Sequence, residues 1–160
     1  MTVKWYGDKL VSKMEKLQVQ ALKVCGALLE REIKLSMKPG TGNEYVRGGK
    51  IHRASAPGQP PAVDTGRLRA SITYNWSGSG RGRAPIQNPS KETKSNDGVG
   101  EPAASRHEVV AVVGTNVKYG RYLELGTTKI KPRPYLRPAL ENNRNEIEKI
   151  FYSILQQGLA

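Results

Sequence analysis

Apolar residues recur at helical spacing from about Gly7 to Met37. They step by alternating fours and threes, which places them in one stripe along a helix. The stripe consists of Leu10, Met14, Leu17, Ala21, Val24 and Leu28, widened by Leu22, Cys25, Leu29 and Ile33. Asp8 is placed to cap the start of this helix, and residues 38–40 (Lys-Pro-Gly) end it. We expect so long a helix to pack along a sheet or a neighbouring subunit.

Two stretches have the pattern of β-strands. The first follows a tight Asp-Thr-Gly turn at residues 64–66, and in it apolar and polar positions alternate, which predicts one buried and one solvated face. Its apolar positions are Leu68, Ala70, Ile72, Tyr74 and Trp76, and its polar ones are Arg69, Ser71, Thr73 and Asn75. The second runs from His107 to Gly114 and has five consecutive apolar residues, 109–113. Such a run predicts a central strand that is buried on both faces.

Two long segments rich in glycine, proline and polar residues predict loops. Residues 38–66 contain little apolar material, and residues 77–106 are mainly polar and rich in glycine, serine and proline. Loops of this length are usually functional or disordered. The second loop lies between the two strands, so we interpret it as a long hairpin arm.

The segment from Tyr119 to Leu140 predicts a helical turn, a stop and a connector. Tyr119, Tyr122 and Leu123 share one helical face, and Gly126 ends that turn. Three prolines follow (132, 134 and 138), which predicts a stiff, extended, basic connector. A last helix then begins with proline in its first turn and Leu136 packing back, and ends near Gly158. Its apolar face contains Leu140, Ile147, Ile150, Phe151, Ile154 and Leu155.

This order of elements predicts an α+β fold: a small, mainly antiparallel sheet on which a long N-terminal and a C-terminal helix pack, plus two loop arms. A length of 160 residues fits a single domain covering residues 1–160.

The chain is strongly basic, with a formal net charge of +12, and the excess is largest in residues 38–106. Such a charge attracts polyanions without specifying one, so a solvated basic surface and a surface facing nucleic acid or acidic protein partners remain equally open. Cys25 is the only cysteine and lies in an apolar helical run, so we expect a buried, inert thiol and no disulfide. No stretch has the apolar length of a signal peptide or a membrane span, so we expect a soluble protein made in the cytosol.

Few residues carry catalytic chemistry. His52 and His107 have no second ligand at metal spacing, so we expect neither a metal nor a cofactor. Asp64 is better explained as a turn residue than as a general base. Glu124 lies near several cations of the sequence, which favours a structural ion pair over catalysis. We therefore predict that the protein is not an enzyme, with a hydrolase that uses Asp64 and Glu124 as a remote alternative.

Arginines flank the aromatic residues of the first predicted strand. Basic residues interleaved with aromatic ones can bind single-stranded nucleic acid, although the alternation places Tyr74 and Trp76 on the core face. The candidate residues for contact with DNA or with a partner are Arg67, Arg69, Arg81, Arg83, Lys91 and Lys94.

Two blocks of sequence resemble the head–tail joining and tail-completion proteins (neck, minor tail components) of long-tailed bacteriophages. One is SAPGQPPAVDTGRLRASI, residues 55–72. The other contains Val-Gly-Thr after an apolar strand, Tyr-x-x-Tyr-x-Glu-x-Gly-Thr, and Arg-Pro-Tyr-Leu-Arg-Pro-Ala-Leu, in that order. The resemblance covers about a third of the chain, and the long 77–106 loop departs from the family pattern.

The resemblance implies a structural virion protein that forms a homo-oligomeric ring, of six copies, around the channel through which DNA leaves the head. Its implied partners are the tail terminator and tail tube proteins and the head-completion (stopper or adaptor) proteins, with assembly in the host cytoplasm and no membrane contact. We expect subunit or partner contacts at Tyr119, Arg121, Tyr122, Glu124, Gly126, Arg133, Pro134 and Tyr135. The alternative is a basic nucleic-acid-binding module.

Overall fold

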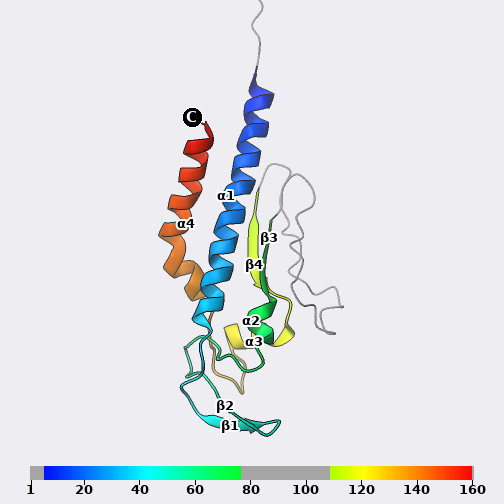
Figure 1. Ribbon diagram of the computed structural model, residues 1–160, viewed down its shortest axis with the longest axis vertical. Coiled ribbons are helices and arrows are strands. Elements are labelled where there is room, and N and C mark those ends of the chain that lie inside the picture. Colours follow the sequence, from blue (N-terminus) through cyan, green and yellow to red (C-terminus); the bar gives the residue numbers. More distant parts are fainter. Residues whose placement is uncertain (1–5, 77–108, 160) are drawn as a thin grey trace, which may run out of the picture.

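The computed structural model describes residues 6–76 and 109–159, and its fold is α+β, as the sequence predicts. Helix α1 (Gly7–Ser36) lies in the middle of the molecule (Figure 1). Helix α4 (Leu136–Leu159) packs antiparallel along one side of α1, and strands β3 (Ile72–Trp76) and β4 (Ala111–Thr115) pack on the other side. The expectation that α1 packs along a sheet is confirmed.

The long N-terminal helix is confirmed, but its buried side differs in detail from the predicted stripe. Ala21, Cys25 and Ile33 are buried, whereas Leu10 and Val24 are 56% and 43% exposed. Cys25 contacts α4 and Gly26 contacts β3, so small residues lie where these elements pack closely on the helix. Asp8 lies inside the first turn, and no side chain caps the start of α1.

The first predicted strand begins later than expected. Residues Arg67–Ser71 form a short helix, α2, and only Ile72–Trp76 form β3. Gly66, with φ of 75°, precedes α2, and the Ser71 hydroxyl donates to the carbonyl of Leu68 at 2.8 Å, so the chain makes one helical turn before it extends. The prediction of a strand from Leu68 is therefore wrong.

The buried face of β3 also differs from the alternation in the sequence. Asn75, which was expected to be solvated, is 4% exposed, while Tyr74 and Trp76 are half-buried. Both aromatic rings face α1: a Cβ atom on Gly26 would lie 2.6 Å from the Tyr74 ring, and Lys23 Nζ lies 4.6 Å from the centre of the Trp76 ring. The two aromatic residues thus pack on α1, on the core face of the sheet where the alternation places them.

Strand β4 pairs antiparallel with β3, with Ile72 opposite Thr115 and Trp76 opposite Ala111. Among the described residues this sheet has two strands, so the prediction of a central strand buried on both faces is wrong. Only Gly114 of β4 is buried. Helix α1 covers one face of this sheet, and one covered face is enough to accommodate the apolar run that contains β4. His107 and the whole of the predicted 77–106 arm lie outside the described residues.

Part of the predicted 38–66 loop is a second antiparallel sheet. Strands β1 (Glu44–Arg47) and β2 (Lys50–Arg53) form a hairpin at the end of the molecule opposite the start of α1 (Figure 1). Gly48 and Gly49 connect the strands and have φ of 57° and 75°, the conformation that a two-residue hairpin turn requires. The prediction of a loop is therefore wrong at residues 44–53, which form this hairpin.

The predicted turn and stop at residues 119–126 are confirmed. Helix α3 spans Lys118–Leu125, and Gly126 follows it with φ of 76°. The connector is less extended than expected, because the N–H group of Thr127 donates to the carbonyl of Ile130 at 2.8 Å and closes a turn. Pro138 lies in the first turn of α4, as predicted, but Leu140 is 53% exposed and does not belong to the packed face.

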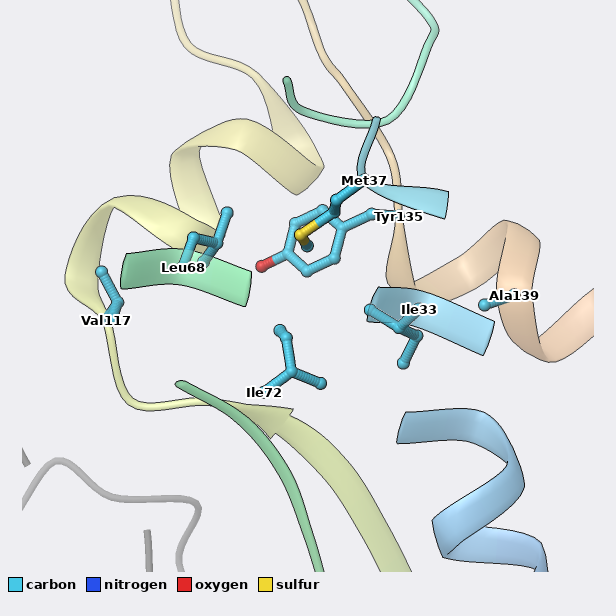
Figure 2. Packing of buried hydrophobic residues seen from close by; sticks show 7 residues of the cluster. All are labelled: Ile33, Met37, Leu68, Ile72, Val117, Tyr135 and Ala139. Carbon is cyan, nitrogen blue, oxygen red and sulfur yellow. The ribbon is translucent and has the colours of Figure 1, made fainter. Parts of the chain in front are cut away.

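A cluster of buried apolar residues forms the core where α1, α2, β3 and α4 meet (Figure 2). Tyr135 lies in its centre, with Met37 against its ring and its hydroxyl group directed toward Leu68. The cluster consists of Ile33, Met37, Leu68, Ile72, Val117, Tyr135 and Ala139. Tyr135, which follows the connector and directly precedes α4, thus joins the C-terminal helix to the rest of the fold through its packing in the core.

Cys25 is buried between α1 and α4, where its thiol lies 3.7 Å from the carbonyl oxygen of Ile147. Burial raises the pKa of this thiol, which disfavours the reactive thiolate, as expected. None of the described helices is both long and apolar enough to cross a membrane. The described residues also contain no cluster of three or more histidine, cysteine or acidic side chains that could hold a metal ion.

Candidate functional site

Glu124 of α3 caps the start of α4. Its carboxylate accepts the backbone N–H groups of Tyr135 at 2.8 Å, Leu136 at 3.0 Å and Arg137 at 3.0 Å. These groups have no partner within a helix, and a negative charge at a helix N-terminus is favourable. No ion pair to Glu124 is found in the described part of the chain, so the expected structural ion pair is replaced by this cap.

The neighbouring predicted contact residues lie at different depths. Tyr119 and Tyr122 are 39% and 53% exposed, and Arg121 between them is exposed as well. Tyr135 is 1% exposed and belongs to the core. Burial is the main cause that raises the pKa of its phenol, and the charges of Glu124 and Tyr119 add to it.

A cleft of about 720 Å³ opens next to α3. It is lined by the end of α1, the β1–β2 hairpin, the segment from Pro61 to Arg69, α3 and the connector. Its apolar lining comes from buried or half-buried side chains, namely Met37, Ala54, Pro61, Ala62, Val63, Leu68 and Leu123. Two tyrosines, Tyr45 and Tyr119, stand at its edge and are partly exposed.

Five arginines line the same cleft, against one carboxylate, that of Asp64. The arginines are Arg47, Arg53, Arg67, Arg69 and Arg133. Such a cluster leaves the cleft positively charged, which favours an anionic ligand.

Asp64 connects the β1–β2 hairpin to the rest of the cleft. One of its oxygens lies 2.8 Å from a guanidinium nitrogen of Arg47, and the other lies 2.7 Å from Nδ1 of His52. The His52 ring in turn stacks on Tyr45, with 5.6 Å between ring centres. Asp64 therefore links residues of both hairpin strands to the Asp-Thr-Gly turn, which extends its predicted role as a turn residue.

The remaining arginines differ in their partners. Arg53 is paired within the hairpin, because its Nε lies 2.7 Å from Glu44. Arg69 is exposed and makes no ion pair with any described residue. The Nε–H group of Arg133 is buried and has no acceptor within residues 6–76 and 109–159.

The comparison with protein families shows what kind of protein this is. Residues 4–126, more than half of the chain, match the HK97-gp10-like family, described as "Bacteriophage HK97-gp10, putative tail-component". The chain belongs to this family. It is therefore a structural tail component of a bacteriophage, consistent with the head–tail joining resemblance of its sequence. No curated protein and no solved structure matches the chain.

The match to the HK97-gp10-like family contains nearly the whole cleft. It includes the hairpin, α2 and α3 and ends at Gly126, so Arg133 and the helix that Glu124 caps lie beyond it. The Arg-Pro-Tyr-Leu block of the sequence resemblance also lies beyond the matched residues.

In this member of the HK97-gp10-like family, the structure brings together residues that the sequence placed in two separate groups. Tyr119 and Arg133 were expected at a partner interface, and Arg67 and Arg69 at a DNA or partner arm; all four line one cleft. The other four arm candidates, Arg81, Arg83, Lys91 and Lys94, lie outside the described residues.

The sequence did not reveal that Tyr45, Arg47 and Arg53 belong to this site. Their signal was the Gly48-Gly49 pair between two short runs, which is typical of a hairpin and would have placed these side chains on neighbouring strands.

Proposed function

We propose that this phage tail component forms a homo-oligomeric ring at the junction of head and tail and surrounds the DNA channel, as a tail-completion or neck protein. The observation that carries the proposal is the pair of exposed apolar surfaces on two different elements of a chain that belongs to a phage tail-component family. Exposed apolar patches on a small protein are typical of surfaces that a partner covers.

One surface lies on the hairpin. Val46 and Ile51 face each other across β1 and β2 and are 73% and 71% exposed. The other lies on α3, where Tyr122 and Leu125 are 53% and 66% exposed. A contact between two different surfaces of successive copies is heterologous, and it closes into a ring when the rotation between copies permits. Six copies are the number that the sequence resemblance implies.

The charge of the chain fits a position around DNA. With a net charge of +12, a ring of such chains attracts the phosphate backbone without reading its sequence. The two acidic residues considered for catalysis have structural contacts: Glu124 caps α4, and Asp64 bridges Arg47 and His52. These roles support a non-enzymatic protein that acts by assembly.

The implied partners are the tail terminator or tail tube proteins on one side and head-completion proteins on the other. Assembly in the host cytoplasm and a final place in the neck of the virion complete the proposal.

Sedimentation of the purified chain, with electron microscopy of the largest species, tests the ring. We expect closed rings from the wild-type chain, and loss of rings without unfolding when Val46 and Ile51 are both replaced by serine. Leu140→Ser, which changes an exposed leucine on α4, is the matched control and should still form rings. A small discrete species that binds DNA tightly, with a steep salt dependence, would instead support a nucleic-acid-binding module.

A further inference from the structure

The cleft beside α3 combines an apolar interior with a cationic mouth. The fully buried residues of its lining are apolar, namely Met37, Pro61 and Leu68, and Met37 and Leu68 are 3% and 8% exposed. The side chains of Arg47 and Arg53, by contrast, are 67% and 59% exposed. A ligand that fills this cleft must therefore offer an apolar group to the interior and negative charge to the mouth.

Two arginines of the cleft are available to such a ligand. Arg47 and Arg53 already contact Asp64 and Glu44, whereas Arg69 is exposed and has no acidic partner in the described part of the chain. Arg133 buries an Nε–H group that lacks an acceptor among the described residues. A buried donor without an acceptor is costly, so an incoming carboxylate at this position would be favourable.

The shape and lining of the cleft favour a peptide over nucleic acid. Duplex DNA presents phosphates on a convex rod and keeps its bases stacked inside, so it has no apolar group to place among Met37, Val63 and Leu123. An acidic peptide segment with one aliphatic side chain satisfies both requirements, since arginine binds carboxylates through two parallel hydrogen bonds.

We propose that this cleft binds an acidic segment of a partner protein, with an aliphatic side chain in the interior and flanking carboxylates on Arg69 and Arg133. The identification of that partner as another virion protein rests on the proposed neck function. The hairpin forms one wall of the site, and Asp64 holds that wall in place through Arg47 and His52.

The test is fluorescence anisotropy of the full-length chain with a labelled, terminally blocked eight-residue peptide that has one leucine among glutamates. We expect saturable binding, weakened at least about tenfold by Arg69→Gln and by Arg133→Gln. Arg144→Gln removes the same charge from an exposed position on α4 and should leave the affinity unchanged. Peptides with glutamine in place of glutamate, or serine in place of leucine, should each bind at least about tenfold more weakly.

Three results would overturn the proposal: no binding of the acidic peptide, equal losses for Arg144→Gln and Arg69→Gln, or tighter binding of a single-stranded oligothymidylate of equal charge with the same arginine dependence. The last result would make the cleft a nucleic-acid site. Ring formation is measured on the same samples. If rings form and the peptide does not bind, only the cleft proposal fails; if the peptide binds and no rings form, only the ring proposal fails.

Discussion

The carboxylate of Glu124 accepts the backbone N–H group of Tyr135, eleven residues later, at 2.8 Å, so a residue of α3 caps the start of α4. The same carboxylate accepts the next two N–H groups. Tyr135 meanwhile places its ring in the centre of the core (Figure 2). This pair fixes both the start and the direction of α4, and so determines how the C-terminal helix reaches α1.

Replacing Glu124 with glutamine should lower the free energy of unfolding by about 1–2 kcal/mol, because the cap loses its charge and one acceptor oxygen. Urea denaturation measures the loss. Glu148→Gln is the control, since Glu148 is exposed and pairs with the exposed Arg144, so its loss should cost less than about 0.5 kcal/mol. Equal stability of the two variants would contradict the capping role.

Tyr135→Phe should leave the protein at least as stable as the wild type at pH 7, because the buried hydroxyl group has no hydrogen-bond partner within the described residues. Thermal unfolding measures this. Tyr152→Phe, on an exposed face of α4, should have no effect and is the control.

The free energy of unfolding at alkaline pH gives a second test of the burial of Tyr135. Burial raises the pKa of this phenol above its ordinary value of about 10, so the folded state keeps the proton that the unfolded chain releases. Stability from this group is therefore complete below about pH 10 and falls as the pH rises further. Tyr135→Phe should unfold less steeply with pH in this range than the wild type, and identical slopes would contradict the burial.

Gly126→Ala should destabilise the protein by about 2 kcal/mol or more. Its φ is 76° with ψ of 177°, a region that favours glycine, and a Cβ atom would lie 2.9 Å from the Ile130 carbonyl oxygen. Gly58→Ala is a matched control, because Gly58 has φ of 79° but open space around it, so its cost should be smaller, about 1 kcal/mol. Denaturant titration of both variants decides, and equal costs would contradict the crowding at Gly126.

Asp64→Asn should loosen the β1–β2 hairpin without unfolding the core. The change removes the carboxylate that Arg47 and His52 share, whereas the backbone bond from Ala54 to Asn43 remains. Hydrogen exchange of residues 44–53 should become about two- to fivefold faster. Glu44→Gln, which removes only the exposed contact to Arg53, should change it less. Unchanged exchange in Asp64→Asn would show that the hairpin does not depend on this bridge.

The sequence predicted the elements whose signal is local and repeated. The long apolar stripe gave α1, and Gly126 and Pro138 gave the end of α3 and the start of α4. The α+β class followed from their order. These signals are strong because a helix of many turns repeats its pattern, and because glycine and proline restrict the backbone directly.

The sequence failed where tertiary contacts override a short pattern. Leu68, Ala70 and Ile72 alternate like a strand, yet residues 67–71 make a helical turn that brings Leu68 into the core. Asn75 is polar but buried, because position on the sheet decides its environment. The cap by Glu124 and the arginine cleft join residues far apart in sequence, and spacing alone does not show such neighbours.

The most direct test of the proposed function is a cryo-electron microscopy map of the neck of virions that carry this chain. The account predicts a closed ring of copies at the head–tail junction, with DNA density on its axis and the hairpin of each copy against α3 of the next. Virions that lack the chain at this position, or that carry it as isolated copies without mutual contact, would contradict it.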